Sequence, residues 1–272
     1  MLHFLHAAKP DSERLVRELD ALSIGDPADR SEFTLARIAR EADRMAQADP
    51  AMAESVRGIL AALRWDVERL DRHFERALQL AAPGAAPTVL FNHAVALERV
   101  HRIEQAAARA AAAVDLSPED LEQLRGALWL GLRAGRLDLA HDLLARLARA
   151  AEQRVAQDEA AARILRRLEQ AGGQGAVRAA FAAVHELLAR KRVVTRRTGL
   201  WLGPEEEVGY VHEAWMSASA AAGLNEAIAA AMTDRTLVPE PAMRTITAYA
   251  VGLIADSETA PDERLPASVH AG

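Results

Sequence analysis

The stretch from Pro87 to Asp120 reads PTVLFNHAVALERVHRIEQAAARAAAAVDLSPED and carries the strongest fold signal in the chain. Its apolar residues recur at the three- and four-residue spacing of amphipathic helices. Pro50, Pro83 and Pro118 lie 33 and 35 residues apart, which is close to the period of repeated helix pairs. The stretch therefore predicts a helical hairpin that belongs to a repeat.

Large and small residues alternate within this hairpin in a fixed order. Leu90 and Leu97 are large, and the small Ala94 lies between them where a second helix approaches closely. The second helix has small residues at Ala106, Ala110 and Ala113. This order resembles the tetratricopeptide repeat (TPR), in which hairpins stack into an α-solenoid. The resemblance implies a concave face that binds a partner protein or peptide.

The resemblance extends over about residues 51–150. The segment after the hairpin keeps Gly135 at the turn and Ala140 at the crossing of its helices. The segment before it departs from the pattern, because Trp65 replaces the turn glycine. The prediction is a mainly α protein whose residues 1–192 form degenerate TPR-like hairpins, with another helical bundle as the alternative.

The composition changes after residue 192 and predicts a small α+β module over 193–255. Two strand-like segments, Val193–Leu202 and Val208–Met216, precede a helix that ends near Ala231. Residues Met243–Ile254 alternate in polarity and predict a third strand, so the order is ββαβ; the alternative is a helix over Thr245–Ile254. Such a module is small enough to self-associate, which makes a homo-oligomer an option. Residues 256–272 predict a disordered acidic tail.

Composition excludes several classes of protein. The 272 residues carry a net charge of −6 and have a sequence pI of about 5.9, which argues against bulk attraction to nucleic acid or membranes. The absence of cysteine excludes thiol nucleophiles and disulfide frameworks. No apolar run is long enough for a membrane span or a signal peptide. We therefore expect a soluble, cytoplasmic bacterial protein.

No motif predicts a catalytic residue, a cofactor or a metal ion. His185 and Glu186 begin a zinc-protease pattern, but Ala189 occupies the position of the second histidine. His93, His101 and Glu104 share helical spacing, yet they would need a further ligand from elsewhere. We therefore expect a non-catalytic protein: an adaptor, a scaffold or a subunit of a bacterial complex.

Two surfaces are candidates for binding partners. The resemblance implies that one set of side chains faces the concave groove, namely Thr88, Phe91, Asn92, Val95 and Arg99. The alternative is that the C-terminal module fills this groove. The alternative function is a nucleic-acid-associated regulator that uses a basic segment made of Arg190, Lys191, Arg192, Arg196 and Arg197. Trp201 and Tyr210 follow this segment as candidates for stacking on bases.

Overall fold

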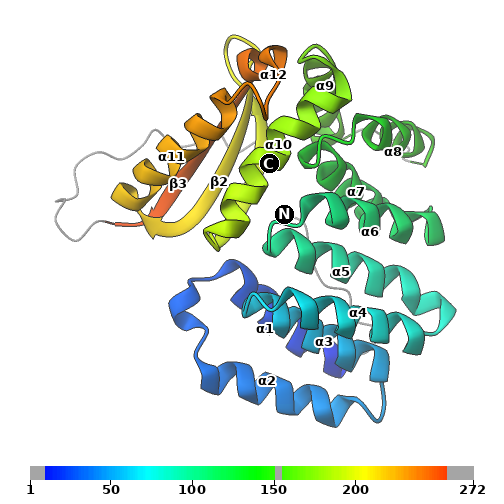
Figure 1. Ribbon diagram of the computed structural model, residues 1–272. Coiled ribbons are helices and arrows are strands. Elements are labelled where there is room, and N and C mark those ends of the chain that lie inside the picture. The colour runs from blue at the N-terminus through cyan, green and yellow to red at the C-terminus, as the bar shows by residue number, and fades with distance from the viewer. Residues whose placement is uncertain (1–9, 151–154, 256–272) are drawn as a thin grey trace.

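The computed structural model describes residues 10–150 and 155–255. It is mainly helical, and a small three-stranded sheet follows the helices (Figure 1). The mainly α fold class and the C-terminal sheet are thus confirmed. The expected acidic tail, 256–272, lies outside the described residues. None of the described helices is both long and apolar enough to cross a membrane.

Helices fill the chain up to the sheet. They are α1 (Pro10–Ile24), α2 (Glu32–Met45), α3 (Pro50–Leu63), α4 (Val67–Leu80), α5 (Ala86–Arg99), α6 (Ile103–Leu116), α7 (Leu121–Arg133), α8 (Leu137–Ala150), α9 (Ala156–Glu169) and α10 (Gly173–Arg190), with short 3₁₀ turns η1 (Pro27–Asp29) and η2 (Pro83–Ala85). Asp49, Asp66 and Asp120 begin α3, α4 and α7, because their side chains accept hydrogen bonds from first-turn amides at 3.0–3.1 Å.

One turn geometry recurs at the ends of α3, α5 and α7. Each turn has one residue in the left-handed region, namely Trp65 (φ 58°), His101 (φ 60°) and Gly135 (φ 67°). The next amide in each turn donates to a carbonyl five residues earlier, at 2.8–2.9 Å, which satisfies the end of the helix. Arg192 (φ 50°) ends α10 in the same conformation. The first three positions are 36 and 34 residues apart, so the turn repeats at nearly the spacing predicted by the prolines.

Substitution of Gly135 by alanine is expected to destabilise the fold by about 2–4 kcal/mol. A Cβ atom at this left-handed position would lie 2.8 Å from the backbone nitrogen of Arg178 in α10. Urea denaturation followed by circular dichroism measures the loss. Gly175→Ala is the matched control, since its Cβ would meet nothing within 4 Å, and we expect it to be neutral or stabilising. Equal stabilities of the two variants would contradict this account of the turn.

The sheet combines antiparallel and parallel pairing. Its strands are β1 (Thr195–Leu202), β2 (Val208–Ser217) and β3 (Ile246–Ile254), in that spatial order. β1 and β2 pair antiparallel, whereas α11 (Ala218–Thr233) returns the chain so that β3 runs parallel to β2. The predicted ββαβ order and the third strand are confirmed. One helix was missed: α12 (Glu240–Thr245) precedes β3 and takes up the first residues of the predicted third strand.

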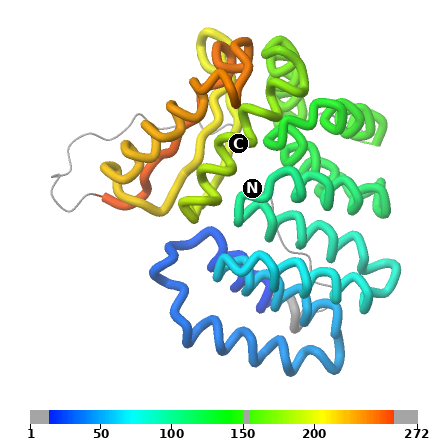
Figure 2. Tube along the Cα trace, viewed as in Figure 1, coloured from blue at the N-terminus to red at the C-terminus, as the bar shows by residue number. Residues whose placement is uncertain are grey.

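The helices and the sheet share one hydrophobic core. Alternate residues of β2, such as Val208, Tyr210 and His212, are buried, and the ring of Tyr210 lies 4.6 Å from that of Phe181 on α10. Helices α10 and α11 cover this face of the sheet (Figure 1). In the chain trace of Figure 2, α10 leads from the helical part into the sheet and lies beside β2. This packing brings residues from distant parts of the sequence together.

Asn225 of α11 closes part of the outer edge of β3. Its amide nitrogen donates to the carbonyl of Ala250 at 2.9 Å, and its amide oxygen accepts from the Ala250 amide at 2.6 Å. The side chain thereby satisfies both backbone groups that another strand would use at this position. A second strand therefore cannot pair with β3 at Ala250 without displacing Asn225.

Candidate functional site

Three histidines and a tyrosine form a buried cluster where the helical part meets the sheet. We call His101, His185, His212 and Tyr210 the histidine cluster. The three imidazole centroids are 5.6–6.3 Å apart, and the Tyr210 ring lies 4.6 Å from that of His212. All four side chains are buried. The cluster joins the turn after α5, the helix α10 and the strand β2.

Hydrogen bonds tie the cluster to the sheet and leave two ring nitrogens without a partner. Nε2 of His101 donates to the carbonyl of Val193 at 2.8 Å, and Nδ1 of His212 lies 3.3 Å from Oγ1 of Thr198. Nε2 of His185 is hydrogen-bonded to the Tyr210 hydroxyl. Nδ1 of His185 and Nε2 of His212 have no hydrogen-bond partner among the described residues. The His185 ring and the His212 ring are therefore each held by one hydrogen bond.

Burial keeps the cluster uncharged at neutral pH. It lowers the pKa of His101 to about 4 and the pKa values of His185 and His212 well below their ordinary value. The other histidines and the Arg133 guanidinium lower the last two pKa values further. Burial also raises the pKa of the Tyr210 hydroxyl. A proton added anywhere in this cluster would introduce a buried positive charge.

A buried ion pair lies beside the cluster. Nη1 of Arg133 is 2.8 Å from Oε1 of Glu98, and the two side chains are only 7% and 13% exposed. The same nitrogen donates to the carbonyl of Thr198 in β1 at 3.0 Å. Arg99 donates to two further carbonyls at the start of this strand, those of Thr195 and Arg196, at 3.4 Å. Arginines from the ends of α5 and α7 thus fix the start of β1 against the helices.

The cluster was missed by sequence reasoning, which considered its histidines one at a time. His93 and His101 do not converge, because His93 stacks on Phe74 with ring centroids 4.6 Å apart and bonds to Asp71 at 3.0 Å. Glu104 is instead paired with Arg178 at 2.8 Å. Throughout residues 10–150 and 155–255, no group of three or more histidine or acidic side chains is placed to hold a metal ion.

The predicted concave-face residues do not form an open surface. Phe91, Asn92 and Val95 are buried, and Thr88 is half-buried. The Phe91 ring packs against α7 at Gly126, where a Cβ atom would come within 2.4 Å of it. Both amide atoms of Asn92 lack a hydrogen-bond partner among the described residues. Phe91, Asn92 and Val95 therefore pack inside the molecule and do not face an open groove, which corrects the expectation for these three, whereas Thr88 and Arg99 are half-buried.

The predicted basic segment is fully on the surface. All five of its cationic side chains are exposed: Arg190, Lys191, Arg192, Arg196 and Arg197. Trp201 is 38% exposed on the following strand. Tyr210, the second residue expected to stack on bases, is completely buried in the histidine cluster and cannot do so.

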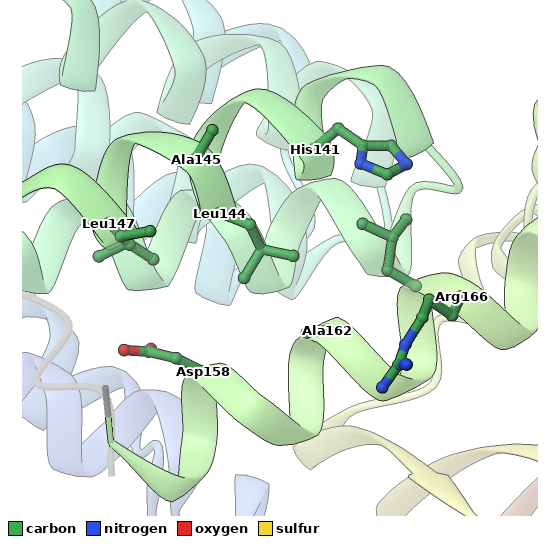
Figure 3. Close-up of a pocket in the computed structure, with 9 residues that line it drawn as sticks. His141, Leu144, Ala145, Leu147, Asp158, Ala162 and Arg166 are labelled. Carbon is green, nitrogen blue, oxygen red and sulfur yellow. The ribbon is translucent and has the colours of Figure 1, made fainter. Parts of the chain in front are cut away.

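A groove between α8 and α9 was not expected from the sequence. It has a volume of about 300 Å³, and Figure 3 shows side chains from both helices turned toward each other across it. Its lining is mainly apolar and consists of His141, Leu144, Ala145, Leu147, Ala148, Asp158, Ala162, Leu165 and Arg166. Asp158 is neutralised by Arg125, which binds both carboxylate oxygens at 3.0 and 3.2 Å. The groove therefore offers an apolar floor with polar groups near its ends.

Comparisons with known proteins do not place the chain in a family. No family model matches the sequence, and no curated protein or solved structure shows a significant similarity to it. The cluster, the groove and the basic segment are therefore the features from which a function can be inferred.

Proposed function

We propose that the chain is a non-catalytic recognition protein of TPR-like hairpins and that it binds a partner protein through the groove between α8 and α9. The groove itself carries this proposal. Leu144 and Leu165 line it from opposite helices, and the small Ala145 and Ala162, which also line it, leave room for side chains of another molecule. Apolar side chains of a partner helix are the ligands that such a groove accommodates best.

The charges at the groove favour binding over catalysis. The Asp158 carboxylate is occupied by Arg125, and the exposed His141 ring bonds to Glu169 at 2.6 Å. Arg166 is exposed near the same end as His141, where it can attract an acidic residue of the partner (Figure 3). The histidine cluster contains four titratable groups, but its burial excludes a substrate from contact with it.

The repeated turn supports the TPR-like part of the proposal. Trp65, His101 and Gly135 give successive hairpins the same left-handed turn at a spacing of 36 and 34 residues. Stacked hairpins of this kind typically display partner surfaces rather than catalytic centres. An adaptor or a subunit of a larger cytoplasmic complex fits these features.

Ala145→Arg is expected to abolish partner binding, because an arginine would fill the apolar groove with a charged side chain. Ala145 is exposed, so the substitution should leave the fold intact. The tagged protein is purified from its native lysate after nuclease treatment, and its partners are identified by mass spectrometry. The expected result is a stoichiometric partner that the wild type retains and Ala145→Arg loses.

Ala160→Arg is the matched control, since Ala160 is exposed on α9 but does not line the groove. Circular dichroism spectra of both variants should match the wild type. If both variants retain the same partner, the groove is not its binding site. If the wild type retains no stoichiometric partner, the recognition function is contradicted.

A further inference from the structure

The two faces of the sheet differ in what covers them. Val208, Tyr210 and His212 of β2 point into the core beneath α10 and α11. The intervening residues belong to the other face, where Val211 of β2 and Tyr249 of β3 are opposite each other and only partly buried. We call this second side the outer face of the sheet.

Trp201 lies on the outer face. It is directly opposite Gly209 in the pairing of β1 with β2, and opposed residues project from the same side of a sheet. A Cβ atom at residue 209 would come within 2.0 Å of the Trp201 indole nitrogen. Only glycine permits this approach, so the indole lies directly against the strand. With 38% of the residue exposed, an aromatic surface remains open to another ring.

One cation of the basic segment, Arg197, lies on this face. Arg197 lies on β1 opposite Glu213. It is four residues before Trp201 on the same strand, and because side chains alternate between the two faces, Arg197 also projects from the outer face. Its guanidinium is 3.8 Å from the Glu213 carboxylate. Within the described residues, the other four cations of the segment have no carboxylate partner: Arg190, Lys191, Arg192 and Arg196. The unpaired positive charge thus lies at the start of β1, and the exposed indole lies near the end of the same strand.

Buried side chains hold the backbone of the basic segment in place. His101 binds the carbonyl of Val193 at 2.8 Å, and Arg133 binds that of Thr198 at 3.0 Å. The cations therefore extend from a fixed backbone rather than from a loose loop. Such preorganisation lowers the entropy that is lost on binding.

We propose that the basic segment and the outer face bind single-stranded nucleic acid, with the cations contacting phosphates and Trp201 stacking on a base. Positive side chains that follow a phosphate backbone, combined with an exposed aromatic ring on a sheet, are the two elements of single-strand binding. A duplex would offer phosphates but would keep its base faces stacked away from Trp201. An acidic peptide would use the cations without the indole. This inference is independent of the groove between α8 and α9.

Fluorescence anisotropy with a labelled 20-nucleotide oligo(dT) and a labelled oligo(U) tests the proposal on the full chain. We expect binding at 50 mM salt that weakens steeply by 200 mM, with a slope of about −2 to −3 in log K against log salt for three to four phosphate contacts. Arg196→Ala/Arg197→Ala should weaken binding about tenfold or more and make the slope shallower.

Trp201→Ala should weaken binding by about fivefold to a hundredfold without changing the salt slope, because stacking releases no counterions. Trp201→Phe should restore part of the affinity, which separates loss of stacking from loss of folding. The control for charge is Arg149→Ala/Arg163→Ala, which removes two exposed arginines outside the basic segment and should leave binding unchanged.

Three outcomes would overturn the proposal. If neither oligonucleotide binds at 50 mM salt, the proposal is wrong. Equal binding of duplex and single strand, together with no effect of Trp201→Ala, would mean simple attraction to charge. Displacement by poly-glutamate as effectively as by unlabelled oligonucleotide, again without an effect of Trp201→Ala, would assign the surface to an acidic protein segment.

Discussion

Lowering the pH from 7 to 5 is expected to remove most of the stability of the protein. His101, His185 and His212 are neutral in the folded state, because burial depresses their pKa values far below 6.5. Unfolded histidines take up protons below about pH 6.5, so the unfolded state binds more protons and stability falls as the pH falls. Each residue contributes a loss of about 2 kcal/mol over this interval. Three together approach the whole stability of a typical domain, about 5–15 kcal/mol.

Urea denaturation at half-unit steps from pH 7.5 to 5 measures this loss. The window stays above the pH at which most carboxylates titrate, so histidines dominate the slope. His101→Asn is the most informative variant, because asparagine tolerates the left-handed turn and does not titrate, although its shorter side chain gives up the bond from Nε2 to the Val193 carbonyl. It should remove about one quarter of the pH dependence, because burial also lowers the pKa of His93 to about 4 and that histidine contributes as well.

His141→Gln is the control for this experiment, since His141 is an exposed histidine outside the cluster. It should remove much less of the pH dependence than His101→Asn does. A wild-type protein that is equally stable at pH 7 and pH 5 would contradict a neutral, buried histidine cluster. The same holds if His101→Asn retains the full slope of the wild type.

Glu98→Gln is expected to destabilise the protein by about 3–5 kcal/mol at pH 7.5. Among the described residues, Glu98 is the only carboxylate within ion-pair distance of Arg133, and the substitution removes it. Arg133 would keep its positive charge in an environment where its side chain is only 7% exposed. Breaking one half of a buried pair costs more than the pair contributes, because the remaining charge is left without compensation.

The double variant Glu98→Gln/Arg133→Met tests this reasoning, because it removes the stranded charge as well. We expect it to be more stable than Glu98→Gln alone in urea denaturation. Glu240→Gln is the matched control on the surface, where Glu240 and Arg244 are 54% and 78% exposed, and it should cost less than about 1 kcal/mol. A loss of less than 1 kcal/mol for Glu98→Gln would show that water reaches this pair.

The local architecture could be predicted from the sequence, because it depends on neighbouring residues. Helix spacing, prolines and small residues predicted the hairpins between Pro50 and Ala150, and β-branched residues predicted the strands. Trp65 was expected to weaken the repeat, yet it adopts the same left-handed turn as Gly135. The hydrogen bonds at the helix end hold the turn even though the residue is not glycine. The sequence of the short helix α12 has too few residues to show a helical spacing of apolar side chains, so it could not be separated from β3.

The candidate sites depended on tertiary packing and were therefore mostly missed. His101, His185 and His212 are far apart in the chain, and they meet only because β2 packs against α10 and the turn after α5. Phe91 was expected to face a groove, but the small Gly126 allows α7 to receive its ring. Only the basic segment could be recognised from the sequence, because five neighbouring cations cannot all be buried.

The junction between helices and sheet also sets an order of events during synthesis. The chain emerges from the ribosome at about 5–20 residues per second, and earlier segments fold first. Glu98 and Arg133 emerge well before Thr198 and His212, which complete their surroundings. A nascent chain interrupted at α10 therefore exposes His101 and the ion pair to water and to proteases. Release of β2 and β3 from the ribosome is the step that protects them.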